Sequence, residues 1–457
     1  MGPIILDSMV RVPEHMLSDT LARQIKRSLT LKSPDMGDYG YGDQKTLRAY
    51  TQEAGYLSIP RNCNYARELL QHNKYEDRRA QGTPINVTFS GEHREGQAEF
   101  IGRLHQGLLE DGVGTIGQAA CGFGKTYCAV NVIALLNTTT LVVVHKEKLG
   151  KQFQKTCKDF LGIDVGWVQG SKSGYVGKKV VIATAQTLYQ KKLPVNFYTQ
   201  FGLVVVDEIH RFSAPTFASA ITQLPARYRL GVTATPRRGD KMEDIFFWHI
   251  GEIEAIGKGK FLDCVVWQVN YDPGLTKGQY HFRGKPNMGK LISALAAHEG
   301  RTGVLVRTIA KAVRKGRKIL VLSDRVAHLE EMQSSLEKMF AAVGETYSVG
   351  IFGSGVSKKA RAAQEAAGTA DVTLATYQMA MEGVDFPEKD TLVLGTPKGD
   401  IEQGVGRIRR LFAGKQIPTV VDICDNVGIL RGMAKKRERY YVTPGRDKRA
   451  WPVRVAG

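Results

Sequence analysis

Short runs of β-branched and other apolar residues recur along this chain, and polar stretches long enough to form helices separate them. The first series is Thr139–Val144, Val180–Ala183, Leu203–Val206 and Leu230–Thr235, and the second is Ile319–Leu322, Ser348–Phe352, Val372–Ala375, Leu392–Leu394 and Thr419–Ile423. Continuous apolar runs of this kind are typical of strands in a parallel sheet that helices cover on both faces. The sequence therefore predicts an α/β fold with two parallel-sheet domains in tandem.

A glycine-rich segment, residues 119–126, lies between a predicted strand, Thr115–Ala119, and a predicted helix, Thr126–Leu136. A strand, such a loop and then a helix form the context in which proteins cradle nucleotide phosphates. The alternative is an ordinary loop that ends in Gly-Lys-Thr, because the first glycine of the usual G-x-x-x-x-G-K-T pattern is Ala119 here. The rest of the chain favours the nucleotide site.

Four residues of this loop have the chemistry that ATP and Mg²⁺ require. Gly122 and Gly124 let the backbone bend so that successive N–H groups point at phosphate oxygens, and the following helix adds its positive dipole end. Lys125 would reach the terminal phosphates, and the hydroxyl of Thr126 would bind the magnesium ion.

Two acidic residues, Asp207 and Glu208, follow the apolar run Leu203–Val206 directly. Open α/β sheets bind ligands at the carboxyl ends of their strands, where this pair would lie. Asp207 would hold Mg²⁺ through its water shell, and Glu208 would orient and deprotonate the water that attacks the γ-phosphate. An isolated Asp-Glu pair is more often an ordinary strand end, but here it completes a predicted nucleotide-hydrolysing site.

The composition indicates a nucleic-acid partner and argues against several other classes. Lysine and arginine total 64 against 45 aspartate and glutamate, a formal net charge of +19, although a merely soluble basic protein is the alternative. The six cysteines form no C-x-x-C pair, which disfavours a zinc site or a disulfide framework and suits a reducing compartment. We found no secretory signal and no apolar run long enough for a membrane span, and we expect a cytoplasmic protein of a bacterial or phage-infected cell.

Further short motifs occur in a fixed order across residues 90–410. They are Arg94-Glu95-Gly96-Gln97, His145–Phe153, Thr184-Ala185-Gln186-Thr187-Leu188, Asp207-Glu208-Ile209-His210, Thr233-Ala234-Thr235-Pro236, Ser323-Asp324-Arg325, Thr376 with Glu382-Gly383-Val384-Asp385, and Gln403 to Arg410. In this order the chain resembles a superfamily 2 helicase, which implies two RecA-like lobes that share one ATP site.

The resemblance also implies roles for individual residues. Gln97 would contact adenine, and Arg94, Gly383 and Asp385 would also belong to the nucleotide site. The residues implied to contact nucleic acid are Lys148, Thr184, Gln186, Arg325 and Thr376, and those implied to couple hydrolysis to that grip are His210, Thr233 and Thr235.

The last motif has the physical logic of an arginine finger. Charge builds on the γ-phosphate oxygens as the bond breaks, and Arg407 and Arg410, supplied with Gln403 by the second lobe, would neutralise that charge. Hydrolysis would then require the lobes to close, and ATP turnover would open and close them cyclically.

Within the superfamily, the residues of these motifs resemble those of XPB, the phage helicase UvsW and type I restriction translocases. The resemblance is greatest to the phage helicases that process branched DNA. These features are Asp-Glu-Ile-His, Thr-Ala-Thr and the glutamine, Gln403, that opens the last motif. The chain departs from the pattern at His145, where proline is usual, and has no recognisable accessory motif in residues 1–85.

We expect four parts in the chain: a small N-terminal accessory domain for DNA recognition, residues 1–88; a first RecA-like lobe, 89–255; a second, 256–430; and a basic tail, 431–457. Asp35–Gly42 is a predicted turn-forming segment. Asp272–Lys290 is a predicted exposed excursion, either a solvated loop or a nucleic-acid contact. The tail, with aromatic and basic residues, is either disordered or a phosphate-contacting and stacking segment.

The predicted function is an ATP-dependent DNA helicase or translocase that acts, as a monomer, on forked, junction or R-loop DNA in replication, recombination or repair. RNA–DNA hybrids are a further candidate partner. The alternatives are an RNA helicase, a duplex translocase that does not separate strands and, from another class, an ATP-gated nucleic-acid clamp.

Overall fold

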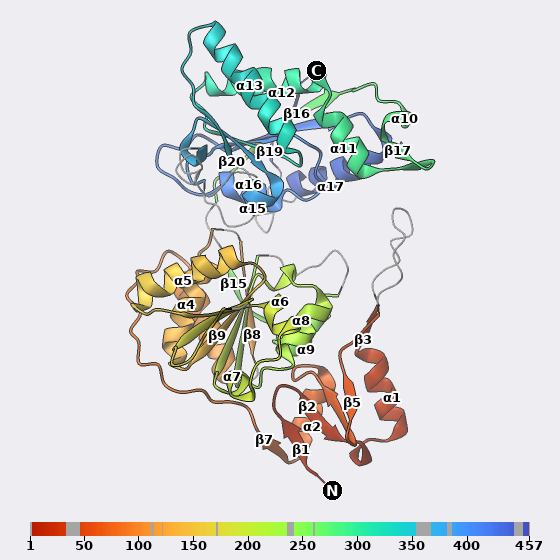
Figure 1. The fold of residues 1–457 in the computed structure, drawn as a ribbon, viewed down its shortest axis with the longest axis vertical. Helices are drawn as coiled ribbons and strands as arrows, with labels where there is room; N and C mark the ends of the chain where they lie inside the picture. The colour runs from red at the N-terminus through yellow and green to blue at the C-terminus, as the bar shows by residue number, and fades with distance from the viewer. Residues whose placement is uncertain are drawn as a thin grey trace. The chain divides into compact units, whose positions relative to one another are not determined.

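The computed structural model describes residues 2–32, 46–110, 114–120, 122–170, 172–234, 242–258, 261–352, 367–381, 386–442 and 451–456. The chain divides into two compact units, Met1–Gly259 and Lys260–Gly457 (Figure 1). Each unit contains a large, mainly parallel sheet, so the predicted tandem α/β fold is confirmed. The predicted turn segment Asp35–Gly42 lies outside the described residues.

The large sheet of the first unit has eight strands in the order β11-β10-β12-β9-β13-β14-β8-β15. All neighbouring pairs are parallel except β10 with β11. The strands are β8 (Thr115–Ala119), β9 (Thr140–Val144), β10 (Gly166–Gln169), β11 (Lys172–Gly174), β12 (Val180–Thr184), β13 (Leu203–Asp207), β14 (Tyr228–Thr233) and β15 (Ile253–Gly257). Every predicted run of the first series is a strand, because fully apolar residues suit a sheet covered on both faces.

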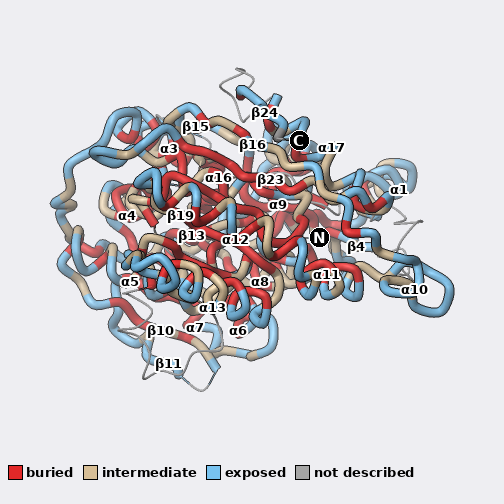
Figure 2. The backbone as a smooth tube through the Cα atoms, turned by 90° about the horizontal axis from the view of Figure 1, so that it is seen from above, coloured by how far each residue is buried: buried red, intermediate tan, exposed pale blue. Residues whose placement is uncertain are grey.

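Helices cover both faces of this sheet and use alternate residues of its strands. On one face Val142, Val205 and Val232 pack with α3 (Gln97–Glu110), α4 (Lys125–Leu136) and α5 (Glu147–Leu161). On the other face Val143 and Val204 pack with α6 (Ala185–Gln190), α7 (Val195–Thr199), α8 (Ala214–Ile221) and α9 (Asp244–His249). This alternation follows from the two-residue period of a strand. In Figure 2 the central strands are accordingly the buried part of the fold.

The N-terminal residues form a small five-stranded sheet in the order β5-β6-β2-β1-β7. Its strands are β1 (Ile4–Leu6), β2 (Val10–Pro13), β5 (Thr51–Glu53), β6 (Tyr56–Ile59) and β7 (Tyr75–Asp77); α1 (Asp19–Ser28), α2 (Asn64–His72) and the pair β3 (Thr30–Lys32) and β4 (Thr46–Arg48) accompany it. Its apolar residues belong to the same core cluster as α6–α9. Two fully buried arginines join the regions, since Arg61 donates to the carbonyl of Ala226 at 2.9 Å and Arg229 donates to that of Ser8 at 2.8 Å. The N-terminal sheet is therefore fused to the first large sheet in one body.

The second unit contains a seven-stranded sheet in the order β20-β21-β19-β22-β23-β16-β24, parallel throughout. Its strands are β16 (Val265–Tyr271), β19 (Ile319–Ser323), β20 (Val349–Phe352), β21 (Val372–Thr376), β22 (Thr391–Leu394), β23 (Thr419–Asp425) and β24 (Val453–Ala456). On one face pack α12 (Glu299–Val313) and α13 (Val326–Ala342), and on the other α15 (Tyr377–Met381), α16 (Glu402–Ile408) and α17 (Arg431–Val442). The predicted strands of the second series are all present.

The C-terminal residues differ from the separate basic tail that we expected. Residues 431–442 form α17, and β24 adds an edge strand to the sheet beside β16. Tyr441 and Trp451 are buried, and Tyr441 donates its hydroxyl to Asp422 at 2.9 Å. These aromatic residues fill the core of the second unit, so within the described residues neither a disordered tail nor a base-stacking surface is correct.

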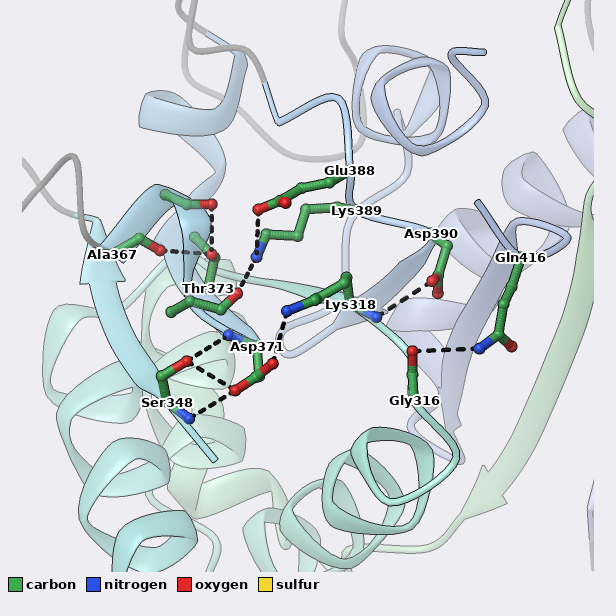
Figure 3. A network of polar contacts seen from close by, with 12 residues as sticks. Gly316, Lys318, Ser348, Ala367, Asp371, Thr373, Glu388, Lys389, Asp390 and Gln416 are labelled. Atoms are coloured by element: carbon green, nitrogen blue, oxygen red, sulfur yellow. Dashed lines mark hydrogen bonds and ion pairs between the residues drawn. The ribbon is translucent and has the colours of Figure 1, made fainter. Parts of the chain in front are cut away.

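The amino ends of the strands in the second unit are closed by a polar network (Figure 3). Asp371 accepts from the ammonium of Lys318 and the hydroxyl of Ser348, each at 2.8 Å. Lys389 is fully buried and donates to the carbonyl of Ala370, and its burial lowers the pKa of its ammonium to about 8. These groups bind one another, which leaves the opposite, carboxyl edge as the place for ligands.

Among the described residues, no helix has both the length and the apolar character needed to cross a bilayer, and no cluster of three or more His, Cys, Asp or Glu side chains is arranged to hold a metal.

Candidate nucleotide site at the carboxyl edge of the first sheet

The candidate site lies where parallel strands of the first unit end side by side. Strands β13, β14 and β8 are consecutive neighbours in the sheet, so Asp207, Thr233 and Ala119 end at one edge. The glycine-rich loop leaves β8 and the acidic pair leaves β13. Residues from sequence positions far apart, Lys125 and Glu208 among them, are thereby brought to one place.

The loop holds Lys125 in a buried position at the start of α4. Gly122 and Gly124 have φ angles of 92° and 95°, in the left-handed region that glycine enters without steric cost. The Lys125 ammonium lies 3.1 Å from the carbonyl oxygen of Ala119 and 3.4 Å from a carboxylate oxygen of Glu208. A polyanion that entered this loop would find a cation and the amino end of a helix already in position.

Gln97, the first residue of α3, binds the loop itself. Its amide nitrogen donates to the carbonyl of Phe123 at 2.6 Å, and its amide oxygen accepts from the backbone N–H of Arg94 at 2.8 Å. A side chain at Gly124 would place its Cβ 2.5 Å from that amide nitrogen, so the glycine is required for packing as well as for its φ angle. Gln97 therefore fixes the loop, while Arg94 is exposed beside it.

Sequence reasoning missed Tyr127, which stabilises the segment before α3. Its hydroxyl donates to the carbonyl of Glu92 at 2.6 Å and lies 3.0 Å from Nδ1 of His93. The ring packs edge-on against Phe89. The sequence did offer one signal for Tyr127, namely its position directly after Thr126. A helix that begins at the phosphate-binding loop directs its first side chains toward neighbouring segments.

The acidic pair is poised to receive a cation. Burial, and then the neighbouring charge of Glu208, raises the pKa of the Asp207 carboxyl to about 7. Burial alone would raise the pKa of Glu208 too, but the nearby charges, above all that of Lys125, outweigh it, and the pKa of Glu208 is lowered. A divalent cation would remove the repulsion between the two carboxylates. The residues present thus fit Mg²⁺, with Asp207 and the half-buried Thr126 as the protein groups that would hold it.

The backbone of Glu208 is left-handed, with φ 51° and ψ 53°, which is uncommon for a residue other than glycine. Such strain is concentrated at functional sites. The turn places the Glu208 carboxylate between Lys125 and His210. Its Oε1 lies 3.4 Å from Nζ of Lys125, and its Oε2 lies 3.4 Å from Nδ1 of His210.

His210 connects the acidic pair to the end of β14. Its Nδ1 lies 2.7 Å from the hydroxyl oxygen of Thr233. Burial lowers the pKa of the imidazole to about 4, so the ring is neutral at physiological pH. The amide of Gln118 on β8 also reaches this region and donates to the carbonyl of Ala234 at 3.5 Å. The structure therefore brings His210 and Thr233 together, whereas Thr235 lies outside the described residues.

The nucleic-acid residues expected in the first unit differ in exposure. Thr184 is buried and caps α6 by accepting from the N–H of Thr187 at 3.4 Å. Gln186 on α6 and Lys148 on α5 are exposed. Both helices begin at the carboxyl edge, so Gln186 and Lys148 lie exposed near that edge, whereas Thr184 is a helix cap.

In the second unit, two of the expected contact residues are bound to their own surroundings. Arg325 donates to the Ser293 hydroxyl at 3.0 Å and to the carbonyl of Gly289 at 2.9 Å, which ties it to α11 (Met288–Ala296). The Thr376 hydroxyl accepts from the N–H of Met379 at 3.2 Å. Gly383 and Asp385, the remaining expected residues of that motif, lie outside the described residues.

The arginine motif separates into residues with different surroundings. Gln403 and Arg407 lie on α16, four residues apart and therefore on one face of the helix, and Arg410 follows the helix. Arg409 is different, because its guanidinium stacks 4.9 Å from the centre of the Trp451 ring and donates to the carbonyl of Leu262 at 2.9 Å. Arg409 therefore stabilises the second unit, and Arg407 and Arg410 stay our predicted catalytic arginines.

The fold and the site together define a protein with a phosphate-binding loop, an acidic strand end and a second α/β unit that carries an arginine helix. Residues 90–238 match the family described as Type III restriction enzyme, res subunit. The putative ATP-dependent RNA helicase L396 of Acanthamoeba polyphaga mimivirus is 26% identical over 448 residues, which cover 94% of this chain and 83% of that protein.

Two solved structures are also similar. A fragment of a putative HsdR subunit of a type I restriction enzyme from Vibrio vulnificus YJ016 matches 81% of this chain and 69% of that chain, with a TM-score of 0.56 and 19% identity. T4 UvsW matches 100% of this chain and 99% of that chain, with a TM-score of 0.41 and 15% identity. The family match over residues 90–238 and the relative named as a helicase agree with the resemblance to superfamily 2 helicases that the motifs indicate.

Proposed function

We propose that the protein is an ATP-dependent DNA translocase that unwinds or branch-migrates forked, junction or R-loop DNA. One observation carries the proposal: a chain of contacts along a single edge of the sheet. Lys125 contacts Glu208, Glu208 contacts His210 and His210 contacts Thr233, at distances of 2.7 to 3.4 Å. A phosphate-binding cation, a base and a connection to a neighbouring strand end are the parts that a nucleotide-driven motor needs.

Each residue at this edge has one task in the proposed reaction. The ammonium of Lys125 exchanges its carbonyl and carboxylate contacts for the terminal phosphates of ATP. Glu208, released from Lys125, accepts a proton from the attacking water. Mg²⁺, held by Thr126 and Asp207, would supply charge neutralisation between the phosphates. Gln97 holds the loop through Phe123 and Arg94, and the exposed Arg94 lies beside the loop as a proposed nucleotide contact.

His210 provides the route by which the state of the site reaches the rest of the unit. It contacts the Glu208 carboxylate on one strand end and the Thr233 hydroxyl on the next. A change in the position or charge of Glu208 therefore alters a contact at the end of β14. In the proposed motor this contact, together with Arg407 and Arg410 of the second unit, couples hydrolysis to the grip on DNA.

DNA is proposed as the substrate because of the net charge of +19 and the wording of the motifs, with Asp207-Glu208-Ile209-His210 and Gln403 in place of the forms typical of RNA helicases. Contacts to phosphates from side chains such as Lys148, which is exposed, would make binding tolerant of sequence and sensitive to salt. The exposed basic residues of α1, among them Arg23 and Arg27, support a duplex- or junction-recognition role for the N-terminal sheet.

The test is the ATPase rate measured with a panel of single-stranded, duplex, forked and four-way DNA and the matching RNAs, together with strand displacement on the forked substrates. We expect the largest stimulation with branched DNA, and displacement that requires ATP. Stimulation by RNA alone would contradict the proposal.

The RNA helicase is the second candidate, and the name of the mimivirus relative favours it. Stimulation by duplex without displacement would instead indicate a translocase that does not separate strands. Nucleotide-dependent binding with negligible turnover would indicate an ATP-gated clamp, which the presence of Glu208 and Arg407 disfavours.

A further inference from the structure

A small folded projection lies in the second unit where we expected an exposed excursion. It consists of α10 (Lys277–Tyr280), a hairpin of β17 (His281–Phe282) and β18 (Lys285–Pro286), and the start of α11. Figure 1 shows α10 and β17 at the rim of the unit, next to α11. The nucleotide edge of the first unit and the motifs of the second do not include it, so its surface requires a separate explanation.

The projection is a built element and not an irregular loop. Thr276 and Gln279 form a reciprocal capping box at the start of α10, and Asn287 caps α11 by accepting from the N–H of Lys290 at 2.9 Å. Arg283 and Gly284 have φ angles of 51° and 75°, as a two-residue hairpin turn of type I′ requires. Because arginine rarely adopts such a φ, the tight turn is maintained at a conformational cost.

The projection is anchored to the body of the unit. Leu291 and Leu295 of α11 pack with Val427 and Leu430, and Tyr280 packs against the same cluster. The Asn287 N–H donates to the Tyr280 carbonyl at 2.8 Å and closes the base of the hairpin. The hairpin tip is therefore held in a fixed place relative to the sheet.

One aromatic ring is exposed at the tip and is surrounded by positive charge. Phe282 is 51% exposed, and the Lys290 ammonium and the Arg283 guanidinium lie 5.0 Å and 5.4 Å from its centre. Residues 273–298 contain four lysines and arginines and no aspartate or glutamate. An aromatic face among cations, with no carboxylate nearby in sequence, suits a ligand that combines a flat ring with negative charge.

The projection is also bound to a helicase motif. Arg325, which follows β19, donates to Ser293 and to the Gly289 carbonyl on α11 at 3.0 Å and 2.9 Å. Arg325 therefore joins the projection to the segment that follows β19.

We propose that Phe282 is a stacking platform for an unpaired base of single-stranded DNA, and that Arg283 and Lys290 contact the adjoining phosphates. The proposal rests on the proposed function for the choice of DNA, and it adds a contact site that the helicase motifs do not contain. A base stacked on a rigid tip cannot re-pair at once, so this contact would help to keep separated strands apart.

The experiment compares Phe282→Ala, Phe282→Trp and the wild-type chain in binding to oligothymidylate and to the same strand with abasic sites, by fluorescence anisotropy. We expect Phe282→Ala to weaken binding to oligothymidylate by about 5- to 150-fold, the range for loss of one stacked base. Phe282→Trp should retain affinity. On the abasic strand all three should bind alike, because no base is present to stack.

Val343→Ala is the matched control, since Val343 is another exposed apolar residue of the second unit, 61% exposed. Equal affinity of Phe282→Ala and wild type for oligothymidylate, or an equal loss on both strands, would overturn the inference. Failure of the proposed function is distinguishable, because it appears as a wild-type ATPase rate that DNA does not stimulate. Preference of the wild type for oligouridylate would move the platform to RNA and refute the DNA assignment.

Discussion

The two α/β units bury their structural arginines in opposite ways. In the first unit Arg229 donates to the carbonyls of His249, Ser8, Ile221 and Leu224, at 2.8 to 3.2 Å, and burial lowers the pKa of its guanidinium to about 9. In the second unit burial likewise opposes the charge on Arg437. There the charge of Asp422 and its hydrogen bond outweigh burial and raise the pKa above the ordinary value.

The carboxylates explain this difference. Arg301 makes a two-pronged ion pair with Asp425, at 2.7 and 3.0 Å, and Arg437 donates to Asp422 at 2.9 Å. In the first unit the carboxylates close to the sheet edge, Asp207 and Glu208, are needed for the proposed chemistry. The comparison indicates a different use of buried carboxylates in the two units. In the first unit Asp207 and Glu208 belong to the proposed site, and in the second unit Asp422 and Asp425 form ion pairs that stabilise the fold.

The largest effect that we predict separates catalytic from structural cations. Lys125→Ala should abolish ATP hydrolysis and weaken ATP binding, because this ammonium is the proposed ligand of the terminal phosphates. Arg407→Ala should leave ATP binding intact and lower turnover by about 10³- to 10⁵-fold, the effect of an arginine finger. DNA-stimulated ATPase assays and titration with a fluorescent nucleotide measure both quantities.

Arg307→Ala is the control for this pair, since Arg307 is an exposed arginine on α12 of the second unit. It should keep both turnover and nucleotide affinity. Normal hydrolysis by the Arg407 variant would show that the second unit supplies no arginine to the reaction, and the two-lobe mechanism would then be wrong.

The next effect concerns the buried ion pair of the second unit. Arg301→Met should lower the free energy of unfolding by about 3 to 5 kcal/mol, because it leaves the Asp425 carboxylate buried without its partner. Adding Asp425→Leu should recover most of that loss, since apolar pairs often replace buried ion pairs without cost. Urea unfolding monitored by circular dichroism gives both values.

Arg229→Met is the comparison in the first unit. Its partners are four backbone carbonyls, so no second substitution can remove them and no similar recovery is possible. If Arg301→Met with Asp425→Leu is as unstable as Arg301→Met alone, the ion pair is not what the second unit depends on and the contrast between the units disappears.

Much of the fold could be predicted from the sequence because its strands are continuous apolar runs, such as Leu203–Val206 and Ile319–Leu322, which have few alternatives in a chain of this kind. The contact of Lys125 with Glu208 was also predictable, because parallel strands deliver their ends to one edge. The fusion of the N-terminal sheet was not. Arg61 and Arg229 look like surface residues in the sequence, and only the tertiary fold buries them.

The course of the C-terminal residues was unpredictable for a similar reason. Residues 431–457 are rich in basic side chains, which suggested either a disordered tail or a segment that contacts phosphates and stacks on bases. Tyr441 and Trp451 determine its structure instead. Both rings are buried in the second unit, and the guanidinium of Arg409 lies over the Trp451 ring. The amino-acid composition of a segment is therefore a poor guide to its burial when two aromatic residues determine how the segment packs.

The smallest effect that we predict is the acid sensitivity of the first unit. His249 is fully buried between Arg61 and Arg229, and burial, reinforced by both positive charges, lowers the pKa of its imidazole well below the ordinary value of about 6.5. The folded state therefore resists protonation while the unfolded state accepts a proton below pH 6.5, so this contribution to stability is complete above that pH and decreases as the pH falls. Between pH 7 and pH 5 the loss should be at most about 2 kcal/mol for this histidine. His249→Leu should remove that part of the pH dependence, as measured by urea unfolding at pH 7 and pH 5.

His328→Leu is the matched variant. His328 is a buried histidine of the second unit, and burial lowers the pKa of its imidazole to about 4. Because His328 bonds to Ser323 and Thr302, its replacement should also cost stability at pH 7, whereas His249, whose ring nitrogens have no hydrogen-bond partner among the described residues, should be replaceable at little cost. An unchanged pH dependence in His249→Leu would mean that the arginines between the N-terminal sheet and β14 do not exclude a proton from the unit that they join.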